Sequence, residues 1–277
     1  MEEMKYSVLM SVYHKEQPEY LRDSIESMLN QTAKPDEIVL VKDGPLTEAL
    51  EKVIYEYKDN PILNVIELKE NVGLGKALNI GLTKCRNEIV ARMDTDDISE
   101  LERCEKQYKI LKSQEVSVVG ASVAEFIDDK NNIVAYKDVI ENHNEIIQRM
   151  KYRNAINHPT VMFKKSDVIS AGSYQHCFLN EDYYLWIRMI LKGYRFMNID
   201  KPLVRMRITN ETYLRRGGWK YFITQKKLFE YMLEEKYINI MEYLYNNAIR
   251  FVTRLLVPNK LRKILYLKLL RRNIIIT

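Results

Sequence analysis

Short apolar runs of β type alternate with helical patterns over the first hundred residues of the chain. Four runs with the composition of buried strands lie at 6–12, 38–41, 63–68 and 89–93. Between them, apolar residues recur at three- and four-residue spacing, as on one face of a helix, and Pro18 marks a helix start. Alternating strands and helices predict βαβ units, and therefore an α/β fold with a parallel sheet covered by helices on both faces.

The pattern changes after residue 99. The second part predicts a helix at about 100–113, a strand at 116–119, hairpin-like turns around 128–132, a strand at 160–163, a helix from Asn180 to Ile190, and helices from Glu211 onward. We therefore expect one domain at 1–210, with halves at 1–99 and 100–210, and a helical, basic C-terminal extension at 211–277.

Composition narrows the class of protein. With 46% hydrophobic and 29% charged residues among 277, the chain has the balance of an ordinary folded protein. Its three cysteines follow no CxxC spacing, which favours a reducing compartment, and its four histidines follow no zinc-site spacing. The acidic start at Met1–Lys5 predicts no secretory signal, and the lack of an uncharged run of about 18 residues predicts no membrane-spanning helix.

Positive charge gathers at the C-terminus. The formal charge of the whole chain is +5, and residues 250–277 contain eight Lys and Arg but no acidic residue. From 255 to 270 the cations alternate with Leu and Ile, a pattern typical of a basic amphipathic helix in a membrane interface. A helix packed on the core with a solvated basic face is the alternative. No RNA-binding motif accompanies the charge, so we expect no nucleic-acid partner.

Polar loops follow three of the predicted strands. In parallel sheets ligands bind beyond the carboxyl ends of the strands, and here those ends carry residues 13–17, Asp43 and the run DTDD at 94–97. Carboxylates one residue apart can hold a divalent cation that bridges phosphate oxygens and stabilises the charge of a departing nucleoside diphosphate. The alternative is a solvated acidic turn in which Asp97 or Ser99 caps the next helix.

Six stretches of the sequence resemble one family. The first four, in this order and spacing, resemble the inverting family 2 glycosyltransferases of the GT-A fold: SVYHKEQPEYLRDSIESMLNQT, PDEIVLVKDG, ENVGLGKALNIGL and EIVARMDTDDIS. The last two resemble the acceptor half of the same family, especially bacterial enzymes that build O-antigen, capsule and exopolysaccharide: NHPTVMFKKSDVISAGSY and EDYYLWIRMILKGY. The resemblance spans residues 5 to about 208 and implies a Rossmann-like nucleotide-diphospho-sugar transferase.

The resemblance implies a role for each matching residue on the donor side. Contacts with a UDP-sugar fall to Tyr13, Glu16, Asp43, Asn71, Gly75, Lys76, Arg92 and Asp94. Asp96 would hold Mn²⁺ or Mg²⁺. Asp43 would accept a hydrogen bond from uracil, although Asp-Gly-Pro is also an ordinary turn sequence.

For two parts of this predicted donor site, a physical argument also supports the role that the resemblance implies. Gly75 and Lys76 would bring a helix N-terminus and a cation to the diphosphate, where an ordinary glycine-rich helix start is the alternative. Arg92 would contact the substrate or pair with Asp94 or Asp97, and Asp97 would take a supporting or capping role.

An inverting transfer also needs a base. One carboxylate must take the proton from the attacking hydroxyl, and the resemblance gives this role to Asp182, at a helix start. Apolar neighbours would raise its pKa; the alternative is that Glu181 and Asp182 only complement the helix dipole. Glu181, His158 and Trp186 are candidate contacts to acceptor or phosphate, and for His158 a purely structural role is equally open.

These features together predict a metal-dependent inverting glycosyltransferase. It would move one hexosyl residue, with galactose favoured, from a UDP-sugar to a lipid-linked saccharide acceptor. The Gln-x-x-Arg-Trp motif of processive family members is absent, which favours single-sugar addition, and Arg215 and Arg216 would close over the diphosphate. We expect the protein in the cytoplasm, held at the inner face of the cell membrane through residues 250–277.

Two other classes compete with this prediction. A non-catalytic sugar-nucleotide or glycan-binding module on the same fold is the main alternative. A phosphatase is disfavoured, because that class places its Asp-x-Asp after the first strand, whereas here it follows the fourth.

Overall fold

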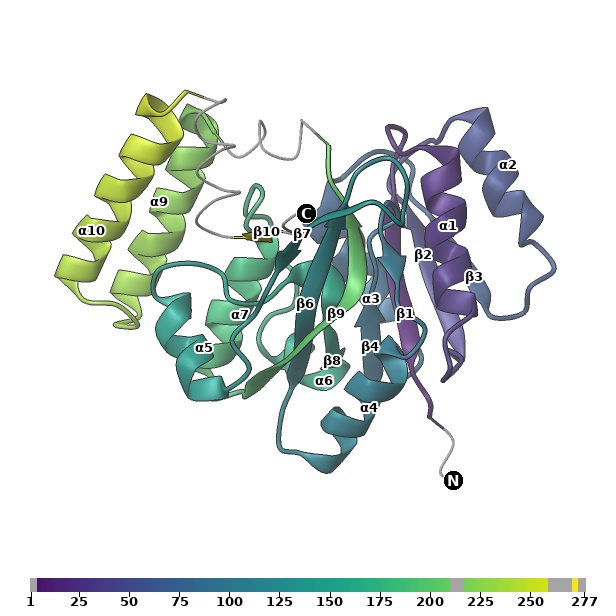
Figure 1. The fold of residues 1–277 in the computed structure, drawn as a ribbon, viewed down its shortest axis with the longest axis horizontal. Coiled ribbons are helices and arrows are strands. Elements are labelled where there is room, and N and C mark those ends of the chain that lie inside the picture. Colours follow the sequence, from purple (N-terminus) through teal and green to yellow (C-terminus); the bar gives the residue numbers. More distant parts are fainter. Residues whose placement is uncertain (1–3, 210–216, 259–270, 274–277) are drawn as a thin grey trace.

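The computed structural model describes residues 4–209, 217–258 and 271–273, which form one mixed sheet with helices on both faces (Figure 1). In chain order the first part contains β1 (Ser7–Val12), α1 (Pro18–Leu29), β2 (Glu37–Lys42), α2 (Glu48–Glu56), β3 (Leu63–Glu67), α3 (Leu74–Lys84), β4 (Ile89–Arg92), β5 (Ile98–Ser99) and α4 (Arg103–Ser113). The second part contains β6 (Val118–Phe126), β7 (Ile133–Lys137), α5 (His143–Met150), a 3-10 turn (His158–Thr160), β8 (Met162–Lys164), α6 (Lys165–Ser170), α7 (Glu181–Leu191), β9 (Phe196–Arg207), α9 (Trp219–Glu234), α10 (Ile240–Phe251), a π-helical turn (Val252–Leu256) and β10 (Arg272–Asn273).

The first four strands form the parallel sheet that the sequence predicts, in the order β3-β2-β1-β4. Their side chains alternate between two faces, as the two-residue period of a strand requires. Leu9, Val39 and Val41 pack in the core that includes α3 and α7, whereas Val8 and Met10 pack in the core that includes α1, α2 and α4. The expectation of helices on both faces is therefore confirmed.

The helices begin where local chemistry allows. Pro18 occupies the first turn of α1, where its missing N–H has no intrahelical partner to lose. At the start of α2 the Thr47 hydroxyl accepts the backbone N–H of Leu50 at 3.3 Å. Helix α7 begins directly after Asn180, as predicted.

Beyond β4 the sheet is mixed, with antiparallel and parallel pairs, in keeping with the change of pattern after residue 99. β8 pairs antiparallel with both β4 and β6, and β6 and β7 form the hairpin expected around 128–132. β9 then runs parallel to β6 and antiparallel to β5. The sequence pattern does not predict β9, because Pro202 lies inside it and proline argues against a strand. In the structure Pro202 falls where the register between β9 and β6 shifts.

Helices α9 and α10 pack against each other at the end of the molecule that lies away from α1 and α2 (Figure 1). The helical pattern from residue 211 onward is confirmed for these two elements. The chain then returns to the sheet as β10, which pairs with β7 and which no pattern predicted. There Arg271 reaches the buried Glu125 of β6 at 2.6 Å, and Arg272 pairs with Asp138 at 3.0 Å.

Some predictions fall on residues that the structure does not describe. The helix expected at 255–270, the boundary between 210 and 211, and the contacts expected of Arg215 and Arg216 all lie wholly or mostly outside the described ranges. Within those ranges, no helix is both long enough and apolar enough to cross a membrane.

Candidate active site

Three carboxylates converge just past the end of β4. Asp94, Asp96 and Asp97 each place an oxygen within 4.8 Å of the others, and they are the one such group of metal-ligating side chains in the described part of the chain. Helix α1 supports the turn, because the Ser24 hydroxyl donates to the carbonyl of Asp94 at 2.7 Å. We call residues 94–97 the aspartate corner.

Asp97 is almost completely buried, with 1% of its surface exposed. Its Oδ1 accepts the backbone N–H of Arg207 at 2.9 Å, whereas its Oδ2 has no hydrogen-bond partner among the described residues. The next helix, α4, has Glu102 as its N-cap, so the prediction that Asp97 caps it is wrong. Leaving a buried carboxylate oxygen without a partner costs free energy, and a bound cation would remove that cost.

Burial and neighbouring carboxylates raise the pKa values of two residues of the aspartate corner. Burial raises the pKa of Asp96 to about 7, and the nearby carboxylates of Asp94 and Glu16 add to the rise. Burial also raises the pKa of Asp97, again helped by its two aspartate neighbours. Carboxylate oxygens are the ligands that Mg²⁺ and similar hard cations prefer. The residues present therefore fit a divalent cation.

The loop after β1 brings a fourth carboxylate to the corner. Glu16 accepts the Thr95 hydroxyl at 2.8 Å through one oxygen and the backbone N–H of Gln17 at 2.9 Å through the other. Burial raises the pKa of Glu16, and Asp94 raises it further. Tyr13, in the same loop, keeps 43% of its surface exposed. The structure thus brings Glu16 to the corner, whereas Tyr13 lies exposed in the same loop.

Arg92 is a buried cation, with 2% of its side chain exposed. Its Nη2 pairs with Asp94, so of the two ion pairs left open by the sequence, the one with Asp94 forms. Its Nε and Nη1 have no hydrogen-bond partner in the described ranges. Arg103 holds the Arg92 backbone by donating to its carbonyl at 2.6 Å. Two buried N–H groups therefore stay available for a ligand.

Asp43 connects the loop after β2 to the loop before α3. Its carboxylate accepts the backbone N–H groups of Val72 at 2.7 Å and Gly73 at 3.1 Å, and its carbonyl accepts the Asn71 side chain at 3.1 Å. Two N–H bonds leave further lone pairs on the carboxylate. Asp43 can therefore order the loop before α3 and still accept one more donor.

The start of α3 lies against the start of α7. Gly73 is the N-cap of α3 at φ 86°, and the side chain of Lys76 in the first turn is exposed. A Cβ at Gly75 would lie 2.9 Å from the Cγ of Glu181, so the glycine permits the close approach of the two helices. The glycine-rich start of α3 and the acidic pair Glu181 and Asp182, far apart in sequence, are thus neighbours.

Asp182 is held by one side-chain contact. Its Oδ2 accepts the side-chain N–H of Asn154 at 2.7 Å. Burial raises the pKa of Asp182, while Lys137 and Arg92 oppose the rise. Burial raises the pKa of its neighbour Glu181 to about 7. Arg92 pairs with Asp94 and also opposes the burial-driven rise in the pKa of Asp182, so its charge acts on both acidic elements of the site.

His158 and Trp186 have structural contacts. His158 Nε2 lies 3.0 Å from the hydroxyl of Tyr174, and burial, assisted by Arg92, holds its pKa well below the ordinary range. The Trp186 ring is completely buried and packs edge-on against His158 and Phe196. The predicted contact of Trp186 with the acceptor stays a prediction; in this structure its ring lies in the core.

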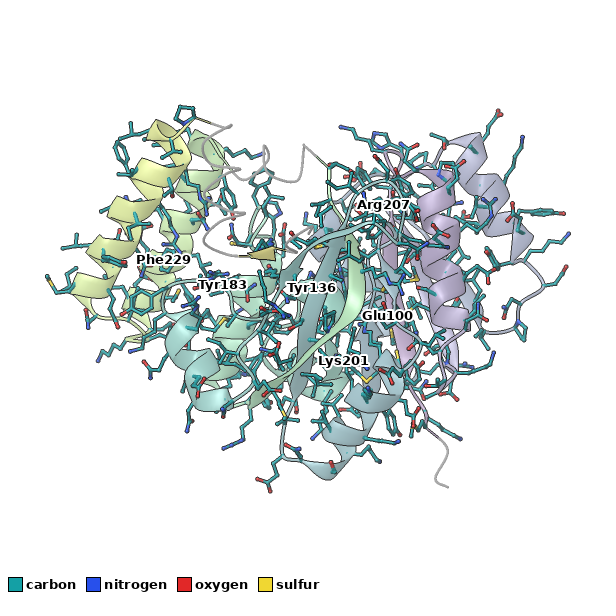
Figure 2. All side chains as sticks on the ribbon, in the orientation of Figure 1. Glu100, Tyr136, Tyr183, Lys201, Arg207 and Phe229 are labelled. Atoms are coloured by element: carbon teal, nitrogen blue, oxygen red, sulfur yellow. The ribbon has the colours of Figure 1, made fainter. Side chains whose placement is uncertain are left out.

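Sequence reasoning missed Arg207, which lies at the end of β9 (Figure 2). Besides the backbone bond to Asp97, its guanidinium donates to the carbonyls of Asp96 and Asp128, both at 3.2 Å. The same group lies 3.6 Å from the ring centre of Tyr20 on α1. Arg207 therefore joins the aspartate corner to the β6–β7 hairpin and to α1. Because β9 was not predicted, no sequence signal pointed to it.

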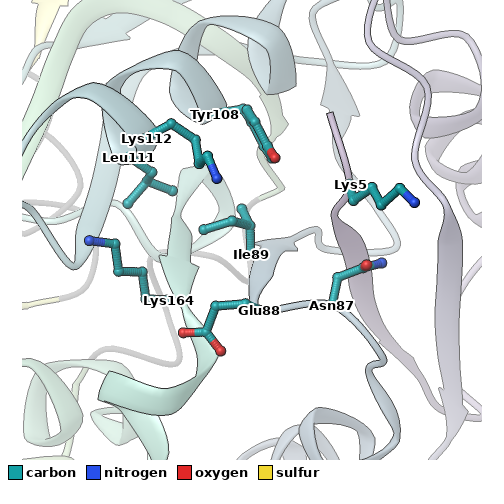
Figure 3. A pocket seen from close by; sticks show the side chains of 8 residues that line it. All are labelled: Lys5, Asn87, Glu88, Ile89, Tyr108, Leu111, Lys112 and Lys164. Carbon is teal, nitrogen blue, oxygen red and sulfur yellow. The ribbon is translucent and has the colours of Figure 1, made fainter. Parts of the chain in front are cut away.

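A hollow of about 610 Å³ opens at the opposite ends of the strands from the candidate active site (Figure 3). It lies at the amino ends of β1 and β4, where Lys5, Ile89 and Lys164 are among its lining residues. None of the predicted site residues lines it, so it is separate from the candidate active site.

Comparisons with known proteins agree with this geometry. A family model described as "Glycosyl transferase family 2" matches residues 7–183. The chain is 41% identical over 264 residues to the amylovoran biosynthesis glycosyltransferase AmsE of Erwinia amylovora, covering 95% of this chain and 98% of AmsE. It is 35% identical over 269 residues to the UDP-Gal:alpha-D-GlcNAc-diphosphoundecaprenol beta-1,3-galactosyltransferase of Escherichia coli, covering 97% of each. Among solved structures, S. aureus TarS 1–349 in complex with UDP-GlcNAc has a similar fold, with a TM-score of 0.67 at 17% identity over 90% of this chain and 73% of that one.

Proposed function

The chain belongs to glycosyl transferase family 2 and is a glycosyltransferase of the GT-A fold, and on that premise we propose its donor, acceptor and mechanism. The enzyme moves a single hexosyl residue, galactose in the version we favour, from a UDP-sugar to a lipid-linked saccharide, with inversion and with a divalent metal. It does so in the synthesis of a bacterial surface polysaccharide. The names of the E. coli and Erwinia relatives support this donor, acceptor and pathway class.

One observation carries the proposal. Arg92 pairs with Asp94 of the aspartate corner and also acts on the charge of Asp182 at the start of α7. The charge of one buried cation therefore acts both on a cluster suited to a metal and on a candidate base. An inverting transfer needs this division, because the leaving diphosphate and the attacking hydroxyl lie on opposite faces of the sugar.

The aspartate corner supports the leaving group. Asp96, together with Asp94 and Asp97, would hold Mn²⁺ or Mg²⁺. Such an ion neutralises charge that builds on the diphosphate oxygens as the bond to the sugar breaks. Arg92 adds a second positive charge, and its buried, unpartnered Nε and Nη1 supply hydrogen-bond donors.

Asp182 acts as the base. Its carboxylate takes the proton of the acceptor hydroxyl as the new C–O bond forms and the bond to UDP breaks. Asn154 fixes one carboxylate oxygen, which orients the other toward the acceptor side. Burial raises the pKa of Asp182, and a carboxylate with a raised pKa is a stronger base once ionised.

The donor is bound by the three loops at the carboxyl edge of the sheet. Asp43 accepts a uracil N–H in addition to its two backbone donors. Tyr13 faces the nucleoside from its exposed position, and Glu16 supports the corner through Thr95. The N-terminus of α3, with Lys76 in its first turn, faces the diphosphate.

Incubation with a panel of nucleotide sugars tests the proposal. The purified chain, with Mn²⁺ and a lipid-diphosphate-linked N-acetylglucosamine acceptor, should release UDP and transfer sugar from UDP-galactose faster than from UDP-glucose, UDP-N-acetylglucosamine or UDP-N-acetylgalactosamine. Transfer of another sugar would replace the favoured donor. Tight binding of a UDP-sugar without turnover on any acceptor would instead favour the non-catalytic binding module.

A further inference from the structure

Helix α10 faces the protein with its polar side chains. The Asn246 amide donates to the carbonyl of Lys151 at 3.0 Å, and Asn246 keeps only 1% of its surface exposed. Glu242, four residues earlier, lies 3.4 Å from the Lys151 ammonium. Arg250, four residues later, lies 4.1 Å from the ring centre of Phe229 and donates to the protein backbone. The side of the helix that faces the protein, its inner stripe, therefore carries amide and charged side chains rather than aliphatic ones.

The opposite stripe of α10 and of the turn that follows is apolar and exposed. Its members recur at three- and four-residue spacing, so they share one face. The exposed fractions are 71% for Met241, 54% for Leu244, 56% for Tyr245, 39% for Ile249, 46% for Val252 and 62% for Leu256. We call these six residues the α10 apolar face. Figure 1 shows α10 as the outermost element at its end of the molecule, with α9 between it and the sheet.

This orientation is the reverse of that in an ordinary surface helix. Such a helix turns its apolar stripe to the core and its polar residues to water. A continuous exposed apolar patch marks a surface that binds another protein or a membrane. The α10 apolar face is therefore a candidate docking surface.

The charge of the sequence around and after α10 bears on the kind of partner. From Lys236 to the C-terminus the sequence has nine Lys and Arg and a single acidic residue, Glu242. Glu242 belongs to the inner stripe, so no acidic side chain lies on the outward side of α10. A second copy docked by two-fold symmetry would pair two α10 apolar faces that both lack acidic side chains, so no opposite charge would favour that pairing. An anionic surface attracts the basic sequence of residues 236–277.

We propose that the α10 apolar face lies in the interface of an anionic lipid bilayer, with the helix parallel to the membrane plane. This inference rests on the proposed function, because a lipid-linked acceptor places the substrate at that surface. It also revises the contact expected of residues 250–277. Arg250, Arg271 and Arg272 are engaged within the protein, so insertion is led by apolar side chains upstream of the basic segment.

An aromatic row extends the same surface. Trp219, with 62% exposed, lies 5.6 Å from Phe222, which lies 5.9 Å from Phe251 at the end of α10. Tryptophan is enriched at membrane interfaces, where one side of its ring is apolar and the other is wet. The chain has one further tryptophan, Trp186, which is completely buried. A change in fluorescence on membrane binding therefore reports on Trp219.

Vesicle flotation of the full chain tests the proposal. The protein should float with vesicles of phosphatidylglycerol and phosphatidylcholine, bind pure phosphatidylcholine less, and show a blue shift of Trp219 emission with the anionic vesicles. The triple variant Met241→Gln, Leu244→Gln, Ile249→Gln should bind at least about tenfold more weakly, because it removes half of the inserted face. The control variant Tyr55→Gln, Ile169→Gln removes exposed apolar side chains elsewhere and should bind like the wild type.

Other outcomes would overturn the membrane proposal, and a parallel activity assay tests the proposed function independently. Equal flotation of the triple variant and the wild type would show that this face does not insert. A wild-type dimer in solution that becomes a monomer in the triple variant, without vesicle binding, would make a second copy the partner. Transfer to a short-chain, detergent-solubilised acceptor is measured in parallel. Normal transfer without vesicle binding refutes only the membrane surface, and vesicle binding without transfer refutes only the proposed function.

Discussion

The backbone N–H of Arg207 donates to the carboxylate of Asp97 across 2.9 Å, although the two residues lie 110 positions apart in the sequence. The bond ties the end of β9 to the turn after β4. The Arg207 side chain reinforces it, because it donates to the Asp96 carbonyl in the same turn. The last strand of the main domain thereby positions the candidate metal ligands, and Arg207 is best regarded as a positioning residue.

Replacing Arg207 by Gln should therefore lower kcat and metal affinity by roughly ten- to a hundredfold, because small displacements of reacting groups are costly. Arg207→Lys should recover part of the loss. Arg205→Gln is the matched control, since Arg205 lies on the same strand but pairs with Glu100 at 2.6 Å. Steady-state kinetics over a range of Mn²⁺ concentrations would separate the two effects. Equal effects at 205 and 207 would contradict a special role for Arg207.

Asp96→Ala should abolish Mn²⁺-dependent transfer, and Asp96→Asn should reduce it by at least about a hundredfold, because a metal supplies several kcal/mol of charge stabilisation. Both should also remove the rise in melting temperature that Mn²⁺ gives the wild type. Asp129→Asn, in the exposed hairpin turn, is the control. An Asp96 variant that keeps both metal responses would place the ligands elsewhere.

Asp182→Asn should bind UDP like the wild type and lose about 10²- to 10⁴-fold in kcat, the usual contribution of a general base. The amide keeps the shape of the side chain and its carbonyl can still accept the Asn154 hydrogen bond. Calorimetry with UDP and a transfer assay would measure the two quantities. A near-normal rate would mean that Asp182 is not the base.

Stability should fall with rising pH because of Glu181. Its pKa is about 7 in the folded protein, above the ordinary value of 4.5. The folded state thus holds a proton that the unfolded state loses first. The contribution to stability is complete below pH 4.5 and lost as pH rises through 7, a change of up to about 3 kcal/mol.

Glu181→Gln should remove this dependence. At pH 8 the variant should melt several degrees above the wild type, and near pH 4.5 the two should melt together. Thermal unfolding at the two pH values is the measurement. A variant that is less stable than the wild type at pH 8 would show that ionised Glu181 makes a favourable contact.

The sequence predicts those features that depend on local pattern. The strands and helices of the first hundred residues, the start of α7 after Asn180 and the place of the aspartate corner follow from periodicity and capping. The family resemblance added donor-side roles for Glu16, Asp43 and Gly75, and these roles stay predictions. In the structure Glu16 contacts the corner through Thr95, Asp43 contacts the loop before α3, and Gly75 lies against Glu181.

Features that depend on distant contacts were out of reach. Pro202 argued against a strand at β9, so β9 was not predicted. The contact of Arg207 with Asp97 depends on β9 and was therefore not predicted either. Trp186 lies in a helix with several apolar residues, and only packing decides that it points to the core. The same limit applies to α10, where periodicity identifies a helix but cannot tell which stripe turns inward.

The return of the chain as β10 bears on how the protein can be trimmed. Residues 7–183 match the family model, but a recombinant fragment cut to those limits would lack β9, the long neighbour of β6, and β10, the outermost strand on β7. It would also leave Glu125, with 0% of its side chain exposed, without the guanidinium of Arg271. We therefore expect a stable recombinant fragment to need the chain through residue 273.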